Sequence, residues 1–226
     1  MTVEPAQLLL IRPKAQSLAF LDECEARLGR RIEAVVSPIF QIEPIGELPD
    51  LRDFGTTVVT SSNAVRRLTD NLAGRDVATV GQATADLARS YGAQIVNSAE
   101  TAQALLDQVE GLTSPVLICR GVHARIDLVT ALQQRGIVAK DAIIYDQIAR
   151  PLSTEAIAML SDVRHVVVPL FSPRSAVLFS EQSYSAPLKL IAISDAVRLA
   201  WAGQGDVQVA RSPTSGAMCD LVTEAL

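Results

Sequence analysis

Short apolar runs that alternate with amphipathic stretches constrain the fold of this chain more than any other feature of its sequence. Most of these runs are continuously apolar, which is the pattern of strands covered on both faces in a parallel sheet. The alternation of strand and helix predicts an α/β protein built from right-handed βαβ units. The predicted strands cover residues 7–11, 57–60, 77–80, 94–96, 116–119, 142–145, 165–168, 188–193 and 207–209.

The amphipathic stretches between the strands predict helices. A glycine stands where each of these helices should stop, and glycine is the residue that most often follows a helix C-terminus. The predicted helices cover residues 15–28, 64–72, 83–91, 102–109 and 126–135, and the glycines are Gly29, Gly74, Gly92, Gly111 and Gly136.

Three pairs of similar segments suggest that the chain contains an internal duplication. The pairs occur in the same order along the chain, with nearly constant separation. Repetition of this kind predicts two structurally similar halves. The paired positions, which lie 108, 111 and 113 residues apart, are Arg12 with Arg120, Ser61 with Ser172, and Thr101 with Thr214.

Prolines favour extended backbone over helix in two stretches, because proline restricts itself and the residue before it. Pro38 and Pro44 bound the first stretch, and Pro151 follows the second. We interpret residues 38–44 and 144–149 as linkers between two domains. Residues 45–143 would form domain 2, and the two ends, 1–37 with 150–226, would form a discontinuous domain 1. The expected fold class is α/β, with two similar parallel-sheet domains, two extended linkers and a cleft between the domains.

The composition is that of a globular protein with a core. Of the 226 residues 49% are apolar, which excludes an intrinsically disordered chain. The net charge of -5 argues against a nucleic-acid-binding protein, whose binding surface is basic. No apolar run approaches the roughly 20 residues that span a bilayer, so we expect no membrane partner.

The cysteines and the N-terminus indicate a reducing compartment. The three cysteines have no short spacing, as expected of buried thiols rather than of a disulfide framework. Residues 1–5 contain no basic run ahead of an apolar stretch, so we expect no signal peptide. We therefore expect a cytoplasmic protein.

The common signatures of cofactor sites are missing from the sequence. Neither glycine-rich nucleotide fingerprint occurs, and neither does the G-x-S-x-G nucleophile elbow. The only histidines are His123 and His165, and no C-x-x-C is present, which argues against a zinc site. Aromatic residues make up 4% of the chain, too few for a platform that stacks single-stranded nucleic acid. We expect no cofactor and no metal.

Polar residues follow several predicted strands, at the end where open parallel sheets bind ligands. Helix starts at these positions favour a carboxylate or phosphate through free N–H groups and the helix dipole. The serines could instead be ordinary N-caps that use the same N–H groups, and both interpretations stay open. The residues in question are Arg12, Ser61, Ser62, Asn63, Gln82, Thr84, Arg120, Ser172 and Arg174.

Two arginines and one tyrosine also have alternative interpretations. Arg12 and Arg120 are either salt-bridged surface residues or part of a basic cleft that attracts a polyanion. Tyr145 ends a strand just before a linker. Its phenol is either a hydrogen-bonded packing group or an acid that points into the cleft. We do not expect His123 or His165 to be catalytic.

Taken in order, these segments resemble the uroporphyrinogen-III synthase family. Each motif is short, but the ordered set is fairly specific and covers nearly the whole chain. The segments are Leu10-Ile11-Arg12-Pro13, Thr60-Ser61-Ser62-Asn63-Ala64-Val65, Val80-Gly81-Gln82-Ala83-Thr84-Ala85, Ile118-Cys119-Arg120-Gly121, Ile144-Tyr145 and Phe171-Ser172-Pro173.

The resemblance implies a lyase that acts in the cleft between two α/β domains joined by two linkers. The implied substrate is hydroxymethylbilane, a linear tetrapyrrole with eight carboxylates. The implied reaction removes the terminal hydroxyl, inverts ring D through a spiro intermediate and closes uroporphyrinogen III, without a cofactor. Such chemistry needs positioning and aimed hydrogen-bond donors more than a strong nucleophile. We expect the chain to act as a monomer.

The resemblance also assigns site residues by position. Tyr145 matches the family tyrosine thought to assist departure of the hydroxyl. Where the family often has a second threonine this chain has Ala196, so we expect Ser194 to take its place and Asp195 to cap the next helix. The residues that match the polar lining of the cleft are Ser61, Ser62, Thr84 and Ser172.

Two other functions stay open from the sequence. One is a non-catalytic two-domain binding protein that senses a small polycarboxylate and closes about its linkers. The other is a paralogue that keeps the fold without the activity, which the alanine at position 196 would permit.

Overall fold

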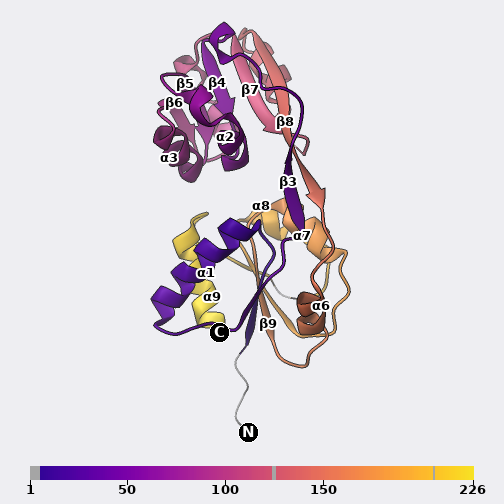
Figure 1. Cartoon of the computed structure of the whole chain (residues 1–226). Helices are drawn as coiled ribbons and strands as arrows, with labels where there is room; N and C mark the ends of the chain where they lie inside the picture. The colour runs from indigo at the N-terminus through magenta and orange to yellow at the C-terminus, as the bar shows by residue number, and fades with distance from the viewer. Residues whose placement is uncertain (1–5, 124–125, 206) are drawn as a thin grey trace. The chain divides into compact units, whose positions relative to one another are not determined.

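The structure is a computed structural model that describes residues 6–123, 126–205 and 207–226 (Figure 1). Residues 1–5, whose sequence predicts no signal peptide, lie outside the described residues. The chain divides into two compact units. Unit 1 comprises Met1–Gln41 with Ile148–Leu226, and unit 2 comprises Ile42–Gln147.

Unit 1 is built on a five-stranded sheet with the order β11-β10-β9-β1-β2. Every neighbouring pair in this sheet is parallel. The strands are β1 (Gln7–Leu10), β2 (Ala34–Val36), β9 (Val166–Leu170), β10 (Leu188–Ala192) and β11 (Val207–Val209).

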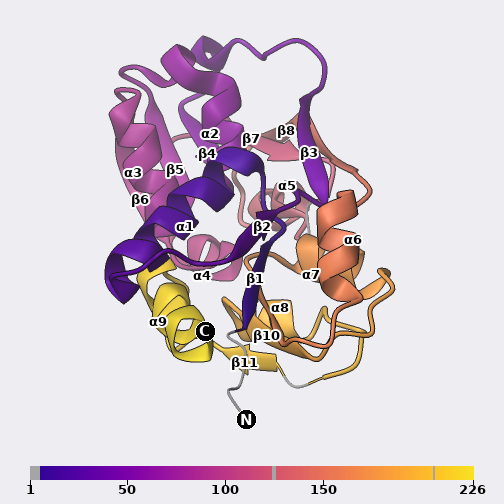
Figure 2. The same cartoon turned by 60° about the horizontal axis from the view of Figure 1, so that its bottom comes forward.

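Helices from both ends of the chain cover the sheet of unit 1. Side by side lie α1 (Lys14–Leu28) and α9 (Ser215–Ala225) (Figure 2). Their buried side chains, such as Phe20 and Met218, pack with Leu8 and Val167 of the sheet in one apolar cluster. The remaining helices of the unit are α6 (Thr154–Leu160), α7 (Pro173–Ser180) and α8 (Asp195–Arg198).

Unit 2 is built on a six-stranded sheet with the order β3-β8-β7-β4-β5-β6. From β8 to β6 the neighbouring strands are parallel. The strands are β3 (Phe40–Pro44), β4 (Thr56–Val59), β5 (Asp76–Val80), β6 (Gln94–Ala99), β7 (Val116–Gly121) and β8 (Ala139–Ala149). The helices are α2 (Ser62–Leu68), α3 (Gln82–Ser90), α4 (Ala102–Leu106) and α5 (Leu128–Gln133), with short 3₁₀ turns at Leu51–Asp53, Thr69–Leu72 and Val109–Gly111.

The continuous apolar runs are explained by cores on both faces of this second sheet. Val59 packs in a cluster with side chains of α2 and α3. Its neighbour Val58 packs in a different cluster, with side chains of α4 and α5. Since successive residues of a strand point to opposite faces, both must be apolar. The predicted α/β fold class with two parallel sheets is confirmed.

The two sheets have corresponding strand orders, as an internal duplication requires. The order β11-β10-β9-β1-β2 of unit 1 parallels β6-β5-β4-β7-β8 of unit 2, and β3 is added at the edge. The paired positions also adopt the same local structure. Ser61 and Ser172 are N-caps with nearly identical backbone angles, and Thr101 and Thr214 cap α4 and α9 in the same way.

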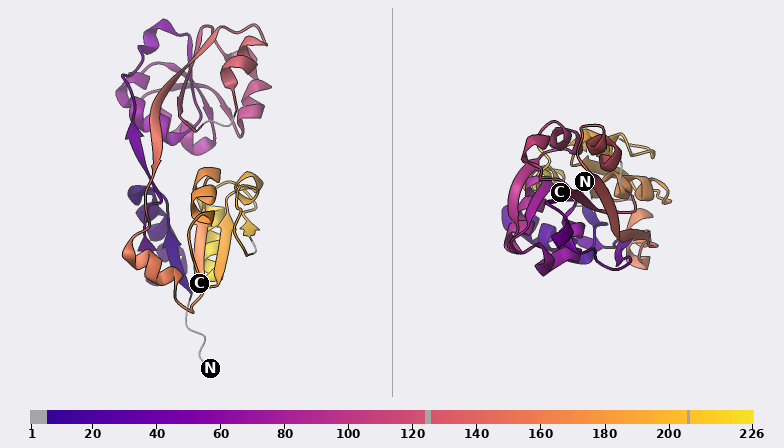
Figure 3. Two further views of the ribbon diagram at one scale, coloured as in Figure 1. Left: turned by 90° about the vertical axis from the view of Figure 1, so that its right-hand side faces the viewer. Right: turned by 90° about the horizontal axis from the view of Figure 1, so that it is seen from above.

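The crossing segments are more regular than the sequence predicted. The predicted strand at 142–145 and the predicted linker at 144–149 form one continuous strand, β8, beside β3 (Figure 3). The backbone N–H of Ile45 donates to the carbonyl of Ile144 at 3.1 Å, and that of Arg150 donates to the carbonyl of Ile39 at 2.9 Å. The strand β2 was not predicted, because three half-buried residues make too short a pattern.

Two predicted helices end early for local reasons. The stretch predicted as a helix at 64–72 breaks after Leu68, where Thr69 takes a positive φ of 43° and a 3₁₀ turn follows. A β-branched residue rarely adopts this conformation, and it stops the α-helical hydrogen bonding. The helix predicted at 102–109 ends at Leu106, again with a 3₁₀ turn after it.

We expect Gly203→Ala to destabilise unit 1. A Cβ at Gly203 would overlap Cζ2 of Trp201, which is stacked on Phe179 with ring centroids 5.7 Å apart and lies near Tyr184. Overpacking of this kind costs about 1–3 kcal/mol of unfolding free energy. Urea denaturation followed by the fluorescence of Trp201, the single tryptophan, measures the change. Unaltered stability would show that the indole moves aside at no cost.

Candidate functional site

Most of the predicted site residues of unit 2 stand at one edge of its sheet. Because β4, β5 and β7 run parallel, their carboxyl ends lie at the same edge, and Tyr145 of the longer strand β8 reaches it by pairing with Gly121, the last residue of β7. We call this the unit 2 edge and define it by Ser61, Gly81, Arg120, Gly121 and Tyr145. Open parallel sheets bind ligands at such edges.

An irregularity in the sheet sets the place of Tyr145. Arg120 pairs with Ile143, but Gly121 pairs with Tyr145, so β8 contains one extra residue at this point. Such a bulge redirects the side chains that follow it. The ring of Tyr145 consequently lies against Gly121, where an added Cβ would be 2.6 Å from Cε2 and Cζ and 3.0 Å from the phenolic oxygen.

Tyr145 is mostly buried, with 7% of its surface exposed, and it packs in the apolar cluster of α2 and α3. Burial raises the pKa of its phenol, while hydrogen bonds with the Ser61 side chain and the Gly121 backbone act in the opposite direction. The phenol is therefore protonated at neutral pH. In this state it can donate a hydrogen bond to an oxygen of a ligand.

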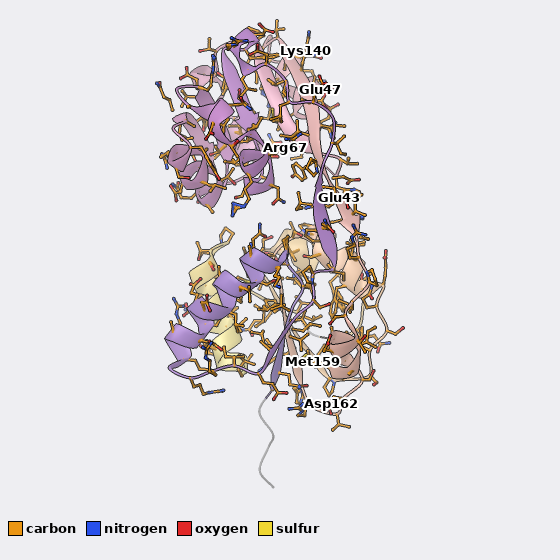
Figure 4. The ribbon with its side chains drawn as sticks, in the orientation of Figure 1. Glu43, Glu47, Arg67, Lys140, Met159 and Asp162 are labelled. Carbon is orange, nitrogen blue, oxygen red and sulfur yellow. The ribbon has the colours of Figure 1, made fainter. Side chains whose placement is uncertain are left out.

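The start of α2 is an ordinary N-cap. The Ser61 hydroxyl accepts a hydrogen bond from the backbone N–H of Asn63 at 3.1 Å. Ser62 is the first residue of the helix and is half-buried. Arg67 in the last turn of α2, labelled in Figure 4, donates from Nη2 to the carbonyl of Gly46 at 3.3 Å. The capping interpretation thus describes Ser61, which in addition bonds with Tyr145.

The start of α3 has a different construction. Gly81 occupies the N-cap position with a φ of 86°, in the left-handed range that favours glycine, and no side chain caps the helix. Gln82 is exposed and its amide donates to the Asp86 carboxylate at 2.8 Å. Thr84 is buried, with 6% exposure. The contact of Thr84 with a ligand that the resemblance implies stays a prediction.

Arg120 makes an ion pair within the sheet. Its Nη2 lies 2.5 Å from Oδ2 of Asp141, and its Nη1 donates to the Gly121 carbonyl at 3.1 Å. The salt-bridged interpretation therefore describes Arg120, whose charge is largely compensated by Asp141. Nearby, Nε2 of His123 lies 3.3 Å from Oδ1 of Asp146.

The corresponding edge of unit 1 carries an arginine on an aromatic ring. The Cζ atom of Arg12 lies 3.9 Å from the ring centroid of Phe171, and Phe171 meets Phe20 edge-on at 5.0 Å. We call these three residues the Arg12 cluster. Arg12 follows β1, and Phe171 follows the neighbouring parallel strand β9.

Ser172 begins α7 with a reciprocal capping box. Its hydroxyl accepts from the Ser175 N–H at 3.1 Å, and the Ser175 hydroxyl accepts from the Ser172 N–H at 3.2 Å. Arg174 lies in the first turn of the same helix, and its buried Nε has no hydrogen-bond partner among the described residues. Ser172 is thus an N-cap, as its counterpart Ser61 is.

The expected N-cap of α8 was wrong. Ser194 holds the N-cap position without a side-chain cap bond, and Asp195 is the first residue of the helix. The Asp195 carboxylate accepts from Nε of Arg198 at 3.0 Å, so its charge is compensated locally. The reason is that Ser194, with φ -161° and ψ 164°, is the last extended residue before the helix, so Ser194 and not Asp195 takes the N-cap position. Whether Ser194 contacts a ligand stays a prediction.

Neither the carboxylates nor the thiols of the described residues assemble a metal centre. No group of three or more His, Cys, Asp or Glu side chains in the part of the chain that the structure describes could hold an ion. Cys24, Cys119 and Cys219 are buried and free of disulfides, as predicted. Burial raises the pKa of the Cys119 thiol to about 12, which keeps it protonated.

Sequence reasoning missed the roles of two residues at these edges. Gly121 has no side chain that would indicate a contact, and Phe171 is an apolar residue directly before the N-cap Ser172. Their contacts with Tyr145 and Arg12 depend on pairing between strands that lie apart in the sequence. Arg125, a further basic residue that follows Arg120 and His123 in the sequence, lies outside the described residues.

Among the described helices, none is long and apolar enough to cross a membrane. A comparison with curated proteins gives no match. Two solved structures share the fold. The uroporphyrinogen-III synthetase of Helicobacter pylori matches with a TM-score of 0.67 at 17% identity, over 97% of this chain and 99% of that chain. A substituted uroporphyrinogen III synthase of Thermus thermophilus matches with a TM-score of 0.58 at 15% identity, over 97% and 98% of the two chains.

A family comparison reaches further than these structural likenesses, because identities this low establish the fold alone. The family model described as uroporphyrinogen-III synthase HemD matches residues 23–220, which is most of the chain. This range includes residues from both parts of unit 1 and the whole of unit 2. The chain belongs to the uroporphyrinogen-III synthase family.

Proposed function

We propose that this chain is a uroporphyrinogen-III synthase, a cyclising lyase of porphyrin biosynthesis. The observation that carries the proposal is the family match over residues 23–220. The chain converts linear hydroxymethylbilane into uroporphyrinogen III with inversion of ring D. The terminal hydroxyl leaves with a proton as water, and the carbon that it leaves becomes the carbon that closes the macrocycle.

The site residues of this proposal stand at the carboxyl edges of both sheets. Tyr145 donates a hydrogen bond to the departing hydroxyl, which its protonated state at neutral pH supports. Backbone N–H groups, hydroxyls and guanidinium groups bind the eight carboxylates. These proposed substrate-binding residues are Arg12, Ser61, Ser62, Asn63, Gln82, Thr84, Arg120, Ser172, Arg174 and Ser194.

The location, oligomeric state, cofactor independence and domain boundaries of the enzyme are part of the same proposal. We infer a cytoplasmic monomer that works without a cofactor, in keeping with buried free cysteines among the described residues. We also infer that residues 1–37 with 150–226 and residues 45–143 behave as two domains joined at 38–44 and 144–149. Sedimentation velocity tests the monomer, and hydrogen exchange of the two segments tests the domain boundaries.

The experiment that tests the function supplies hydroxymethylbilane, oxidises the products and separates the porphyrin isomers. Spontaneous closure gives the type I isomer, so an excess of type III over a protein-free control supports the proposal. Only type I product, at the spontaneous rate, would contradict it. Binding of substrate without turnover would then identify a polycarboxylate-binding protein. The absence of both binding and turnover would identify an inactive paralogue.

We expect activity to weaken as salt is added. The attraction between arginines and a substrate with eight carboxylates is screened, since the Debye length falls from about 10 Å at 0.1 M to about 3 Å at 1 M. The KM for hydroxymethylbilane should rise roughly three- to tenfold between these salt concentrations, with a smaller change in kcat. Initial rates at fixed pH measure this. A flat KM would argue against binding through charged groups.

A further inference from the structure

The Arg12 cluster lies beyond the carboxyl ends of the neighbouring parallel strands β1 and β9. Gln7 pairs with Val166 and Leu8 with Val167 in the parallel pair of β1 and β9. Continuing the same register brings Arg12 beside Phe171. In parallel strands, the side chains of paired residues lie on the same face of the sheet. The side chains of Arg12 and Phe171 are therefore next to each other.

The ring of Phe171 is itself held in place. It meets Phe20 edge-on, at an interplanar angle of 81° and a centroid distance of 5.0 Å. Phe20 belongs to α1 and is 2% exposed, so it has little freedom to move. Phe171 packs against the apolar cluster of unit 1, and its backbone leads directly into the N-cap Ser172.

The contact between Arg12 and Phe171 has the geometry of a cation–π interaction. The Cζ atom lies 3.9 Å from the ring centroid, well inside the roughly 6 Å within which the ring quadrupole attracts a cation. Attraction to the ring face restrains the Arg12 guanidinium beside Phe171. At the equivalent position of the duplication, Arg120 contacts Asp141.

We propose that Phe171 is a positioning residue that orients the Arg12 guanidinium toward a substrate carboxylate. This inference rests on the proposed function, because it concerns substrate binding at the same edge. A planar guanidinium binds a carboxylate with two parallel hydrogen bonds only in a narrow range of orientations. A ring that fixes the guanidinium before the substrate arrives lowers the entropy lost on binding. Phe171 therefore acts on substrate affinity and not on the chemical step.

The test compares Phe171→Leu, which keeps an apolar side chain without a ring, with Phe171→Tyr, which keeps the ring. Phe171→Leu should raise the KM for hydroxymethylbilane about three- to fivefold with kcat within about twofold, the size expected of an exposed cation–π contact. Phe171→Tyr should keep most of the wild-type affinity for hydroxymethylbilane. Phe179→Leu is the matched control, because its ring stacks on Trp201 and not on an arginine.

A second background separates positioning from packing. In Arg12→Gln, Phe171→Leu should raise the KM no further, because the cation is gone. An equal rise in both backgrounds, a Phe171→Tyr variant as weak as Phe171→Leu, or no rise at all would overturn the inference. If Phe171→Leu does not fold, as judged by circular dichroism and thermal unfolding, Phe171→Met replaces it with the same expectation.

A binding measurement separates this inference from the function itself. The probe is uroporphyrin I, a closed macrocycle with eight carboxylates that the reaction cannot convert, and its Kd is determined by absorbance titration. The Phe171→Leu variant should weaken this Kd by the same factor. A chain that makes no type III isomer but shows this loss would contradict the proposed function alone. A chain that makes type III isomer without this loss would contradict only the role of Phe171.

Discussion

Tyr145→Phe should lower kcat with hydroxymethylbilane by about a hundredfold, at the lower end of what a positioned proton donor contributes. The substitution removes one hydroxyl and keeps the ring that packs in the apolar cluster of α2 and α3. The loss of the hydrogen bonds with Ser61 and Gly121 should cost only about 1 kcal/mol of unfolding free energy. Stopped-assay kinetics and urea denaturation measure the two effects separately.

The control for this prediction is Tyr184→Phe. The Tyr184 hydroxyl also makes hydrogen bonds, accepting from the Gln204 N–H at 2.9 Å, but Tyr184 stacks beside Trp201 in unit 1. Its loss should leave kcat near the wild-type value. Equal rates for Tyr145→Phe and the wild type would show that the phenol is a packing group only.

The pH dependence follows from the direction of the Tyr145 shift. Since burial raises its pKa above the ordinary value near 10, the phenol stays protonated through the neutral range. The ratio of wild-type to Tyr145→Phe activity should therefore be constant between about pH 6 and 9. The ratio should fall only as the pH passes the raised pKa of Tyr145, because the phenol then loses the proton that it donates.

Gly121→Ala should lower kcat by about as much as Tyr145→Phe does, because it displaces the Tyr145 phenol instead of removing its hydroxyl. The new Cβ would lie 2.6 Å from Cε2 and Cζ of Tyr145 and 3.0 Å from its oxygen, so the ring must move. Overpacking should also cost about 1–3 kcal/mol of unfolding free energy. Gly111→Ala is the matched control, because its Cβ would meet only the Val96 carbonyl, at an ordinary 3.5 Å.

The double variant of Gly121→Ala and Tyr145→Phe separates the effect of Gly121→Ala on activity from its effect on stability. Its activity should fall little below that of either single variant, because both remove the same donor from its place. Its stability should still show the full cost of Gly121→Ala, because the phenyl ring remains. Multiplied losses of activity would mean that Gly121 acts through another group, and a normal rate for Gly121→Ala would mean that the ring tolerates displacement.

The resemblance of the sequence to the family depends on several short segments. Each segment alone is weakly specific, but their order along the chain matches the order in the family. The serine-led helix starts were recognisable because an N-cap is a local device, formed within three or four residues. The choice between cap and ligand contact was not local. Ser61 turns out to cap α2 and also to bond with Tyr145, which lies far along the chain.

The two arginines illustrate the same limit. Arg12 and Arg120 occupy equivalent positions of the duplication, and the residues next to them in the sequence do not indicate which group each arginine contacts. Asp141 lies on β8 and Phe171 follows β9, and each meets its arginine only because a particular strand pairs beside it. Strand pairing is decided by burial over the whole sheet, which a local pattern does not contain.

The sequence by itself determined the α/β class, the covered parallel strands, the duplicated order and the positions of most helix starts. These follow from hydrophobic periodicity and capping, which act over a few residues. Only the tertiary structure decided that β8 is one continuous strand over Ala139–Ala149, that a one-residue bulge sets Tyr145 against Gly121, and that Arg12 lies on Phe171 while Arg120 lies beside Asp141. Those outcomes depend on register between distant strands, where a shift of one residue exchanges the faces of every side chain.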